Sequence, residues 1–175
     1  RASRSALAGA TSELARARVA MGRCADARGG TRGARAVLEA RLRENPLDAH
    51  QTRVLLFVLH GEGEYLQALG SLPDAVRVRE RAMEIAEEAW RRDSADRWSQ
   101  IGVAVAANAL GDVLLESGDV EDSIRRFRQA LAIAMQAVEE DPRYDFARLE
   151  AASAEYGLGR ALLTLGKPDT VAEGC

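Results

Sequence analysis

The sequence is poor in the residues that most often carry chemistry or covalent cross-links. Its 175 residues include two histidines, two cysteines and a single lysine, Lys167, and neither cysteine belongs to a C-x-x-C pair. A disulfide framework and a zinc site are therefore not expected. Phosphate-binding loops, the G-x-S-x-G elbow, the H-E-x-x-H motif and the kinase signatures are also missing. We expect a chain that is not an enzyme and that needs no metal or cofactor.

Charge of one sign and long apolar runs are scarce as well. The net charge is −3, aromatic residues make up 5% of the chain, and the longest strongly apolar run is Val54 to Leu59. The lack of a basic excess argues against nucleic-acid binding, and so short a run cannot cross a bilayer. No signal peptide opens the chain, which begins at Arg1, so we expect a cytoplasmic protein and a fragment of a longer one.

What the sequence does contain is one repeated interval. Glycines recur every 48 residues, at Gly22, Gly70, Gly118 and Gly166. Small residues keep the same interval, as in the series Ala34, Ala82 and Ala130. A fixed period of this size is typical of repeat architectures, in which each unit buries its apolar face against its neighbours. The pattern favours a surface for holding another molecule over a pocket built for chemistry.

Apolar periodicity predicts two helices in each interval. Residues 97–117 carry apolar side chains at steps of three and four, and Gly118-Asp119 then supplies a helix stop and a new N-cap. The next helix runs to about Glu140, where Asp141-Pro142 ends it. This plan predicts one unit over residues 97–140, another over 50–92 with helices at 50–69 and 73–92, and a partial unit over 145–175 with a helix at 145–165.

The first interval is degenerate. Gly29, Gly30 and Gly33 fall within its expected second helix, residues 23–44. Each glycine costs about 1 kcal/mol relative to alanine inside a helix. We therefore predict a break near residues 28–33, with the helix resuming by about Arg35. Residues 1–22 are expected to form a poorly defined N-terminal helix.

The unit over residues 97–140, the third along the chain, resembles a tetratricopeptide repeat, whose pattern is W-x2-L-G-x2-Y followed by A-x3-F. The matching residues here are Ala107, Leu110, Gly111 and Leu114, then Ser123, Phe127 and Ala130. Small residues at Gly111, Ser123 and Ala130 are expected where helix axes approach. The 48-residue period is longer than the usual 34 and resembles the variant found in multidomain bacterial signalling proteins, often after a serine/threonine kinase domain.

This resemblance implies an all-α fold in which helix-turn-helix repeats form a right-handed α-solenoid. It also implies a protein–protein interaction or scaffolding function within a larger bacterial signalling protein. Members of the family usually bind peptides along the face of the first helices. Carried over to this chain, that face comprises Phe57, His60, Glu64 and Gln67, then Val105, Asn108, Asp112 and Leu115, then Ser153, Tyr156, Arg160 and Leu163.

Spacings of three and four place each of these sets on one helical stripe. The alternative interpretation is a solvated face, or one filled by a neighbouring helix. Because Glu64 and Asp112 would repel a carboxylate, we expect a basic or amphipathic helical partner. A second hypothesis is self-association into a homo-oligomer through an apolar flank formed by Leu158, Leu162, Leu163 and Leu165. A third is small-molecule sensing, which lacks convergent polar groups.

Overall fold

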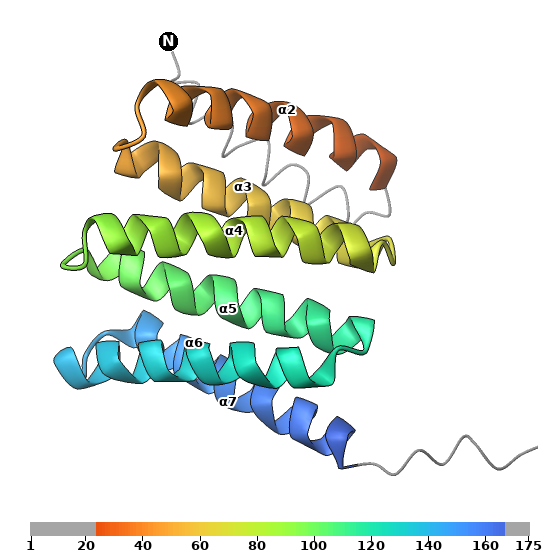
Figure 1. The fold of residues 1–175 in the computed structure, drawn as a ribbon, viewed down its shortest axis with the longest axis vertical. Coiled ribbons are helices and arrows are strands. Elements are labelled where there is room, and N and C mark those ends of the chain that lie inside the picture. The colour runs from red at the N-terminus through yellow and green to blue at the C-terminus, as the bar shows by residue number, and fades with distance from the viewer. Residues whose placement is uncertain (1–23, 167–175) are drawn as a thin grey trace, which may run out of the picture. The chain divides into compact units, whose positions relative to one another are not determined.

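The computed structural model describes residues 24–166, which form helices joined by short turns and contain no β-strand (Figure 1). The helices are α2 (Cys24–Glu44), α3 (Ala49–Ala68), α4 (Leu72–Arg92), α5 (Arg97–Ser117), α6 (Val120–Glu140) and α7 (Asp145–Leu165). The helices α2, α4 and α6 begin 48 residues apart, and so do α3, α5 and α7. The predicted all-α helical repeat is confirmed.

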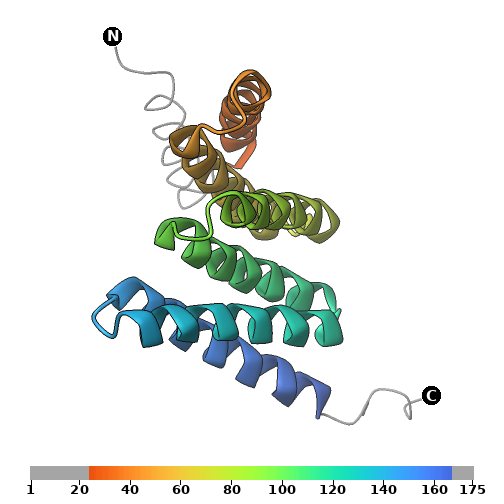
Figure 2. The same cartoon turned by 60° about the vertical axis from the view of Figure 1, so that its left-hand side comes forward.

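The chain divides into two compact units at Asp93–Ser94. In unit 1, α3 packs against both α2 and α4. In unit 2, α5, α6 and α7 all contact one another, and Figures 1 and 2 both show α6 lying alongside α5 and α7. Each unit therefore has helices from two successive repeats, and each is described by itself below.

The helix boundaries lie within one residue of those predicted because local capping signals determine them. Gly118 ends α5 in the left-handed conformation with φ of 91°, which glycine adopts without the steric cost of a Cβ atom. The Asp119 side chain then accepts a hydrogen bond from the backbone N–H of Asp122 at 3.4 Å and caps α6. Asp96 caps α5 in the same way, accepting from the N–H groups of Trp98 and Ser99.

The predicted break at residues 28–33 is wrong, because α2 runs without interruption from Cys24 to Glu44. Glycine lowers helix stability but does not forbid helical dihedral angles. The second half of α2 is rich in alanine, leucine, arginine and glutamate, which favour helix, and Leu38 is buried at 1% exposure. The predictions for residues 1–22, and for the part of the fourth unit beyond Gly166, lie outside the described residues.

Phe127 of α6 is the centre of the core of unit 2. Its side chain is 1% exposed and packs with Ile124 and Ala161. A Cβ atom at Gly111 of α5 would lie 2.8 Å from the Phe127 ring, and one at Gly157 of α7 would lie 2.6 Å from ring atom Cδ1. Both glycines are needed for the helices to approach the ring. Ser123 and Ala130 are also fully buried on α6, as predicted for the small positions.

The corresponding position of unit 1, 48 residues before Phe127, holds Arg79. This arginine is 4% exposed, and its Cζ atom would lie 2.7 Å from a Cβ atom built on Gly63 of α3. Gly63 in turn stands 48 residues before Gly111. The two units therefore share one packing arrangement. In unit 1 the Arg79 guanidinium lies against Gly63, and in unit 2 the Phe127 ring lies against Gly111.

One helix of the described part, α5, is long and apolar enough to cross a membrane by length and composition, with a mean hydropathy of 1.3 in its most apolar window. The sequence-based search for apolar runs missed it because alanine and glycine interrupt the larger side chains. Within the protein 67% of that window is buried. A buried core helix meets the same criterion, so α5 is explained by its packing.

Candidate functional site

Four residues predicted for the binding face of unit 2 lie together. The Asp112 carboxylate of α5 accepts a hydrogen bond from Arg160 Nη1 of α7 at 3.0 Å, and the Arg160 guanidinium lies 5.6 Å from the centre of the Tyr156 ring. Asn108 Nδ2 donates to the backbone oxygen of Glu150 at 3.1 Å and to its carboxylate at 3.0 Å. We refer to Asn108, Asp112, Glu150, Tyr156 and Arg160 as the α5–α7 cluster.

The α5–α7 cluster is buried at one end and open at the other. Asn108 is 7% exposed, so its hydrogen bonds tie α5 to α7 within the unit. Tyr156 is 70% exposed, and the side chains of Asp112 and Arg160 are nearly half exposed. The accessible part of the cluster therefore offers an aromatic ring, a carboxylate and a guanidinium.

The other residues predicted on these two stripes are divided between the interior and the surface. Leu115 is partly buried and packs against the core around Phe127, so it does not belong to an open binding face. Val105 is half-buried. Ser153 and Leu163 are exposed on α7, in line with Tyr156.

In unit 1, two residues of the predicted stripe of α3 contact Arg79 of the neighbouring helix α4. Arg79 reaches His60 Nδ1 at 2.9 Å and Gln67 Oε1 at 3.1 Å, and His60 Nε2 lies 3.2 Å from the Glu64 carboxylate. Because arginine only donates, Nδ1 of His60 must accept, which leaves Nε2 protonated and directed to Glu64. Phe57, at 37% exposure, is the most apolar accessible member of this stripe.

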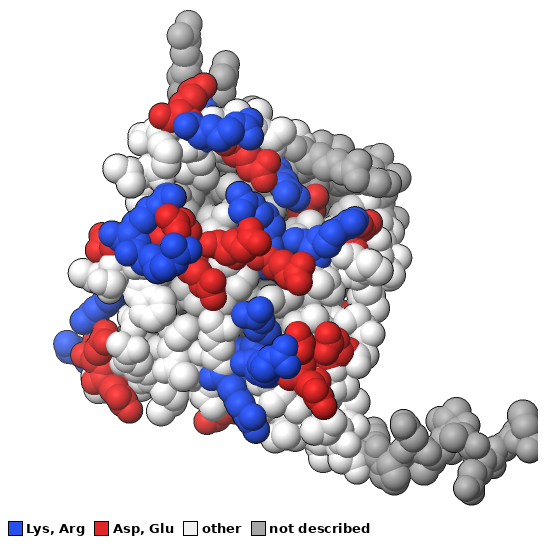
Figure 3. Space-filling model, viewed as in Figure 1, with Lys and Arg blue, Asp and Glu red and all other residues white. Residues whose placement is uncertain are grey.

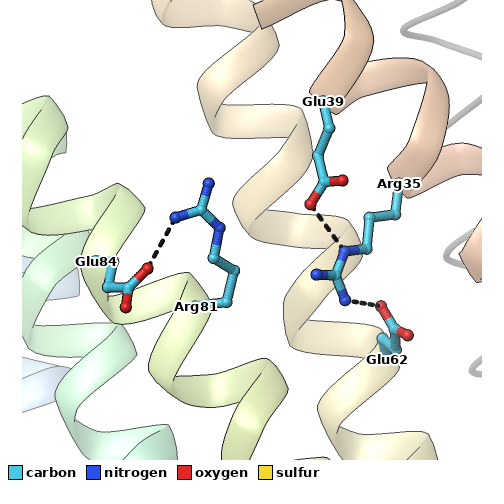
Figure 4. Close-up of polar contacts among 5 residues, drawn as sticks. All are labelled: Arg35, Glu39, Glu62, Arg81 and Glu84. Atoms are coloured by element: carbon cyan, nitrogen blue, oxygen red, sulfur yellow. Dashed lines mark hydrogen bonds and ion pairs between the residues drawn. The ribbon is translucent and has the colours of Figure 1, made fainter. Parts of the chain in front are cut away.

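A second polar network of unit 1 contains a buried carboxylate. Glu62 of α3 is 7% exposed and lies 3.4 Å from Arg35 Nη1 of α2, while Arg35 Nε donates to Glu39 at 2.9 Å (Figure 4). Burial of the Arg35 guanidinium by itself lowers its pKa. The hydrogen bond to Glu39 and the charge of Glu62 outweigh that effect and leave the pKa above its ordinary value.

Unit 1 also contains a groove, which we name the unit-1 groove, with a volume of about 380 Å³. Its walls come from α2 and α4 and its floor from the first turns of α3. The lining residues are Glu39, Leu42, Arg43, Pro46, Thr52, Leu55, Arg81, Glu84, Ile85, Glu88 and Arg92. Figure 3 shows acidic and basic side chains intermixed over α2 and α4, with no extended area of one sign.

Sequence reasoning missed Arg79, Glu150 and the unit-1 groove. A signal for Arg79 was present, because a charged residue stands in the 48-residue register of the buried Phe127. No comparable signal marks Glu150 or the groove, since both depend on which helices meet in space. Among residues 24–166, no group of three or more histidine, cysteine or acidic side chains is arranged to hold a metal ion.

No protein-family model matches the chain, and a comparison with curated proteins gives no match. The functional argument therefore depends on the sequence pattern and on the geometry described above.

Proposed function

We propose that the chain is a protein–protein interaction module with the α5–α7 cluster as its binding surface. The observation that carries the proposal is that Asp112, Tyr156 and Arg160 lie in contact at the surface of unit 2, where Tyr156 is 70% exposed. Exposed tyrosine and arginine side chains are frequent anchors of protein interfaces. The hydrogen bond between Asp112 and Arg160 and the contact of Arg160 with the Tyr156 ring hold these groups in place before a partner arrives.

The partner we favour is a basic or amphipathic helix. Asp112 and Glu150 bring two carboxylates to the cluster against the one guanidinium of Arg160. The carboxylates would attract lysine or arginine of a partner, whose apolar side chains would cover Tyr156 and the exposed Leu163. The tetratricopeptide assignment, the solenoid arrangement and a place in a larger bacterial signalling protein, such as a serine/threonine kinase, belong to the same proposal and are supported by the sequence motifs.

The test is capture of a partner from a bacterial lysate by the wild-type chain and by an Asp112→Lys/Tyr156→Ala variant. We expect the double variant to lose at least tenfold in captured partner, because it removes the ring and reverses one charge of the cluster. The matched control is Glu155→Gln, which changes an exposed side chain of the same helix. Equal capture by all three proteins would contradict the proposal.

Self-association is the second candidate function, and a separate observation favours it. Leu149, Leu162, Leu163 and Leu165 of α7 are between 44% and 71% exposed. Leu158, predicted to belong to the same flank, is half-buried against the core of unit 2 instead. Helical spacing places Leu162 and Leu165 on one face of α7 and Leu149 and Leu163 on another, and a second copy of the chain would cover one of these apolar faces.

A further inference from the structure

None of the residues that line the unit-1 groove was predicted for binding, and the groove has an apolar floor. Leu55 of α3 is 1% exposed and forms part of that floor. Thr52 beside it donates its hydroxyl to the backbone oxygen of Asp48 at 3.0 Å, so its polar hydrogen is already used. Half-buried Leu42 and Ile85 continue the apolar surface on the two walls. A ligand therefore needs an apolar group to cover this floor.

The carboxylates at the rim of the groove already have arginine partners. The pairs are Arg35–Glu39 at 2.9 Å, Arg81–Glu84 at 2.7 Å and Arg92–Glu88 at 2.8 Å. Figure 4 shows the first two on either side of α3. Glu88 has a second partner in Arg91, at 2.5 Å. The acidic side chains of the rim are thus neutralised within unit 1.

The arginines of the rim retain capacity for another anion. Among the described side chains no ion pair involves Arg43, which is exposed at the end of α2. Arg81 shares one of its five N–H groups with Glu84. Arg92 donates one N–H to the backbone oxygen of Pro46 at 2.5 Å, which holds the end of α4 to the turn between α2 and α3. Since Arg81 and Arg92 are paired with Glu84 and Glu88, Arg43 is the one lining arginine without a carboxylate partner among the described residues, and it favours a negatively charged group of a ligand at its end of the groove.

We propose that the unit-1 groove binds a short acidic segment of a partner protein, in which an aspartate or glutamate stands next to an apolar side chain. The apolar side chain packs on Leu55 between Leu42 and Ile85, and the carboxylate pairs with Arg43. A volume of about 380 Å³ is at the lower end for ligand sites and suits a few side chains of an extended segment. This site is distinct from the α5–α7 cluster and has the opposite charge preference.

The test uses the full chain and a labelled peptide, acetyl-Leu-Glu-Leu-Glu-Leu-amide, with its uncharged analogue acetyl-Leu-Gln-Leu-Gln-Leu-amide. Fluorescence anisotropy at low salt should show binding of the acidic peptide at least tenfold tighter than that of the analogue. Arg43→Glu should weaken binding of the acidic peptide about tenfold. The matched control is Arg77→Glu on α4, which changes an arginine with 74% of its side chain exposed that pairs with Asp74 outside the groove and should leave binding unchanged.

Three results would overturn the proposal. Equal affinity for the two peptides would show that no charge recognition occurs. Equal loss in the Arg43 and Arg77 variants would show a diffuse electrostatic effect and not a site. Full displacement of the peptide by an equal concentration of hexanoate would show a site for small carboxylates and not for a protein segment. Because Arg43 is exposed, its variant keeps the fold, which circular dichroism would verify.

Discussion

Single residues decide how closely the helices of unit 2 approach, and the glycines of α7 show the contrast. Gly157 lies against the buried ring of Phe127, whereas a Cβ atom at Gly159, two positions later, would meet nothing within 4 Å. The two glycines share one helix and similar backbone geometry. They differ in whether a methyl group has space.

We therefore predict opposite effects of the same substitution. Gly157→Ala should lower the free energy of unfolding by about 1–3 kcal/mol, because the ring of Phe127 must shift within a packed core. Gly159→Ala should raise it by about 0.5–1 kcal/mol, because alanine favours helix and nothing obstructs it. Urea denaturation of both variants would measure the difference, and equal destabilisation by the two would contradict the structure.

Which side chains meet across helices is the part that the sequence did not predict. The stripe of Asn108, Asp112, Tyr156 and Arg160 followed from helical spacing and the resemblance, and the structure places all four together. The contact of Arg79 with His60 did not follow, because helical spacing says which residues share a face but not which side chain of the next helix reaches it. The unit-1 groove has the same origin, since its walls are separate helices.

At the scale of the element, local signals account for the helix ends. Turn glycines, aspartate caps and the proline after Asp141 act within a few residues, so they can be read without knowledge of the tertiary structure. The prediction for α2 was wrong because it took three glycines to end the helix. Glycine only lowers the stability of a helix, and packing against α3 offsets that loss. Helix propensities therefore indicate how stable a helix is on its own better than they indicate whether it forms in the folded protein.

The N-caps allow a prediction at this scale. Asp96 accepts hydrogen bonds from two backbone N–H groups at the start of α5, whereas Ser71, at the start of α4, makes no capping bond with its side chain. Asp96→Ala should lower the free energy of unfolding by about 1 kcal/mol. Ser71→Ala should have less than half that effect, although it also removes a hydrogen bond to Asp74. Chemical denaturation compares the two, and a larger effect of the serine would contradict the capping geometry.

For the whole molecule, the exposed leucines of α7 lead to a prediction about oligomeric state. If the face with Leu149 and Leu163 binds a second copy, the mass measured by sedimentation should rise with concentration. Leu163→Glu should then weaken the association at least tenfold, because a buried leucine contributes about 1.5–3 kcal/mol. Glu155→Gln is the control on the same helix. A chain that stays monomeric throughout would remove self-association as a function, and a variant that associates as the wild type does would exclude the face with Leu163.

Equivalent positions of the repeat hold Arg79 in unit 1 and Phe127 in unit 2, and this difference limits which parts of the chain can replace one another. The shared 48-residue register suggests that one hairpin could be transplanted for another, as engineers do with consensus repeats. If α4 alone replaced α6, it would carry a cation into a site lined for an aromatic ring and leave His60 and Gln67 of α3 behind. A chimera of this kind needs Arg79, His60 and Gln67 moved together, so the true exchangeable piece is the helix pair α3–α4.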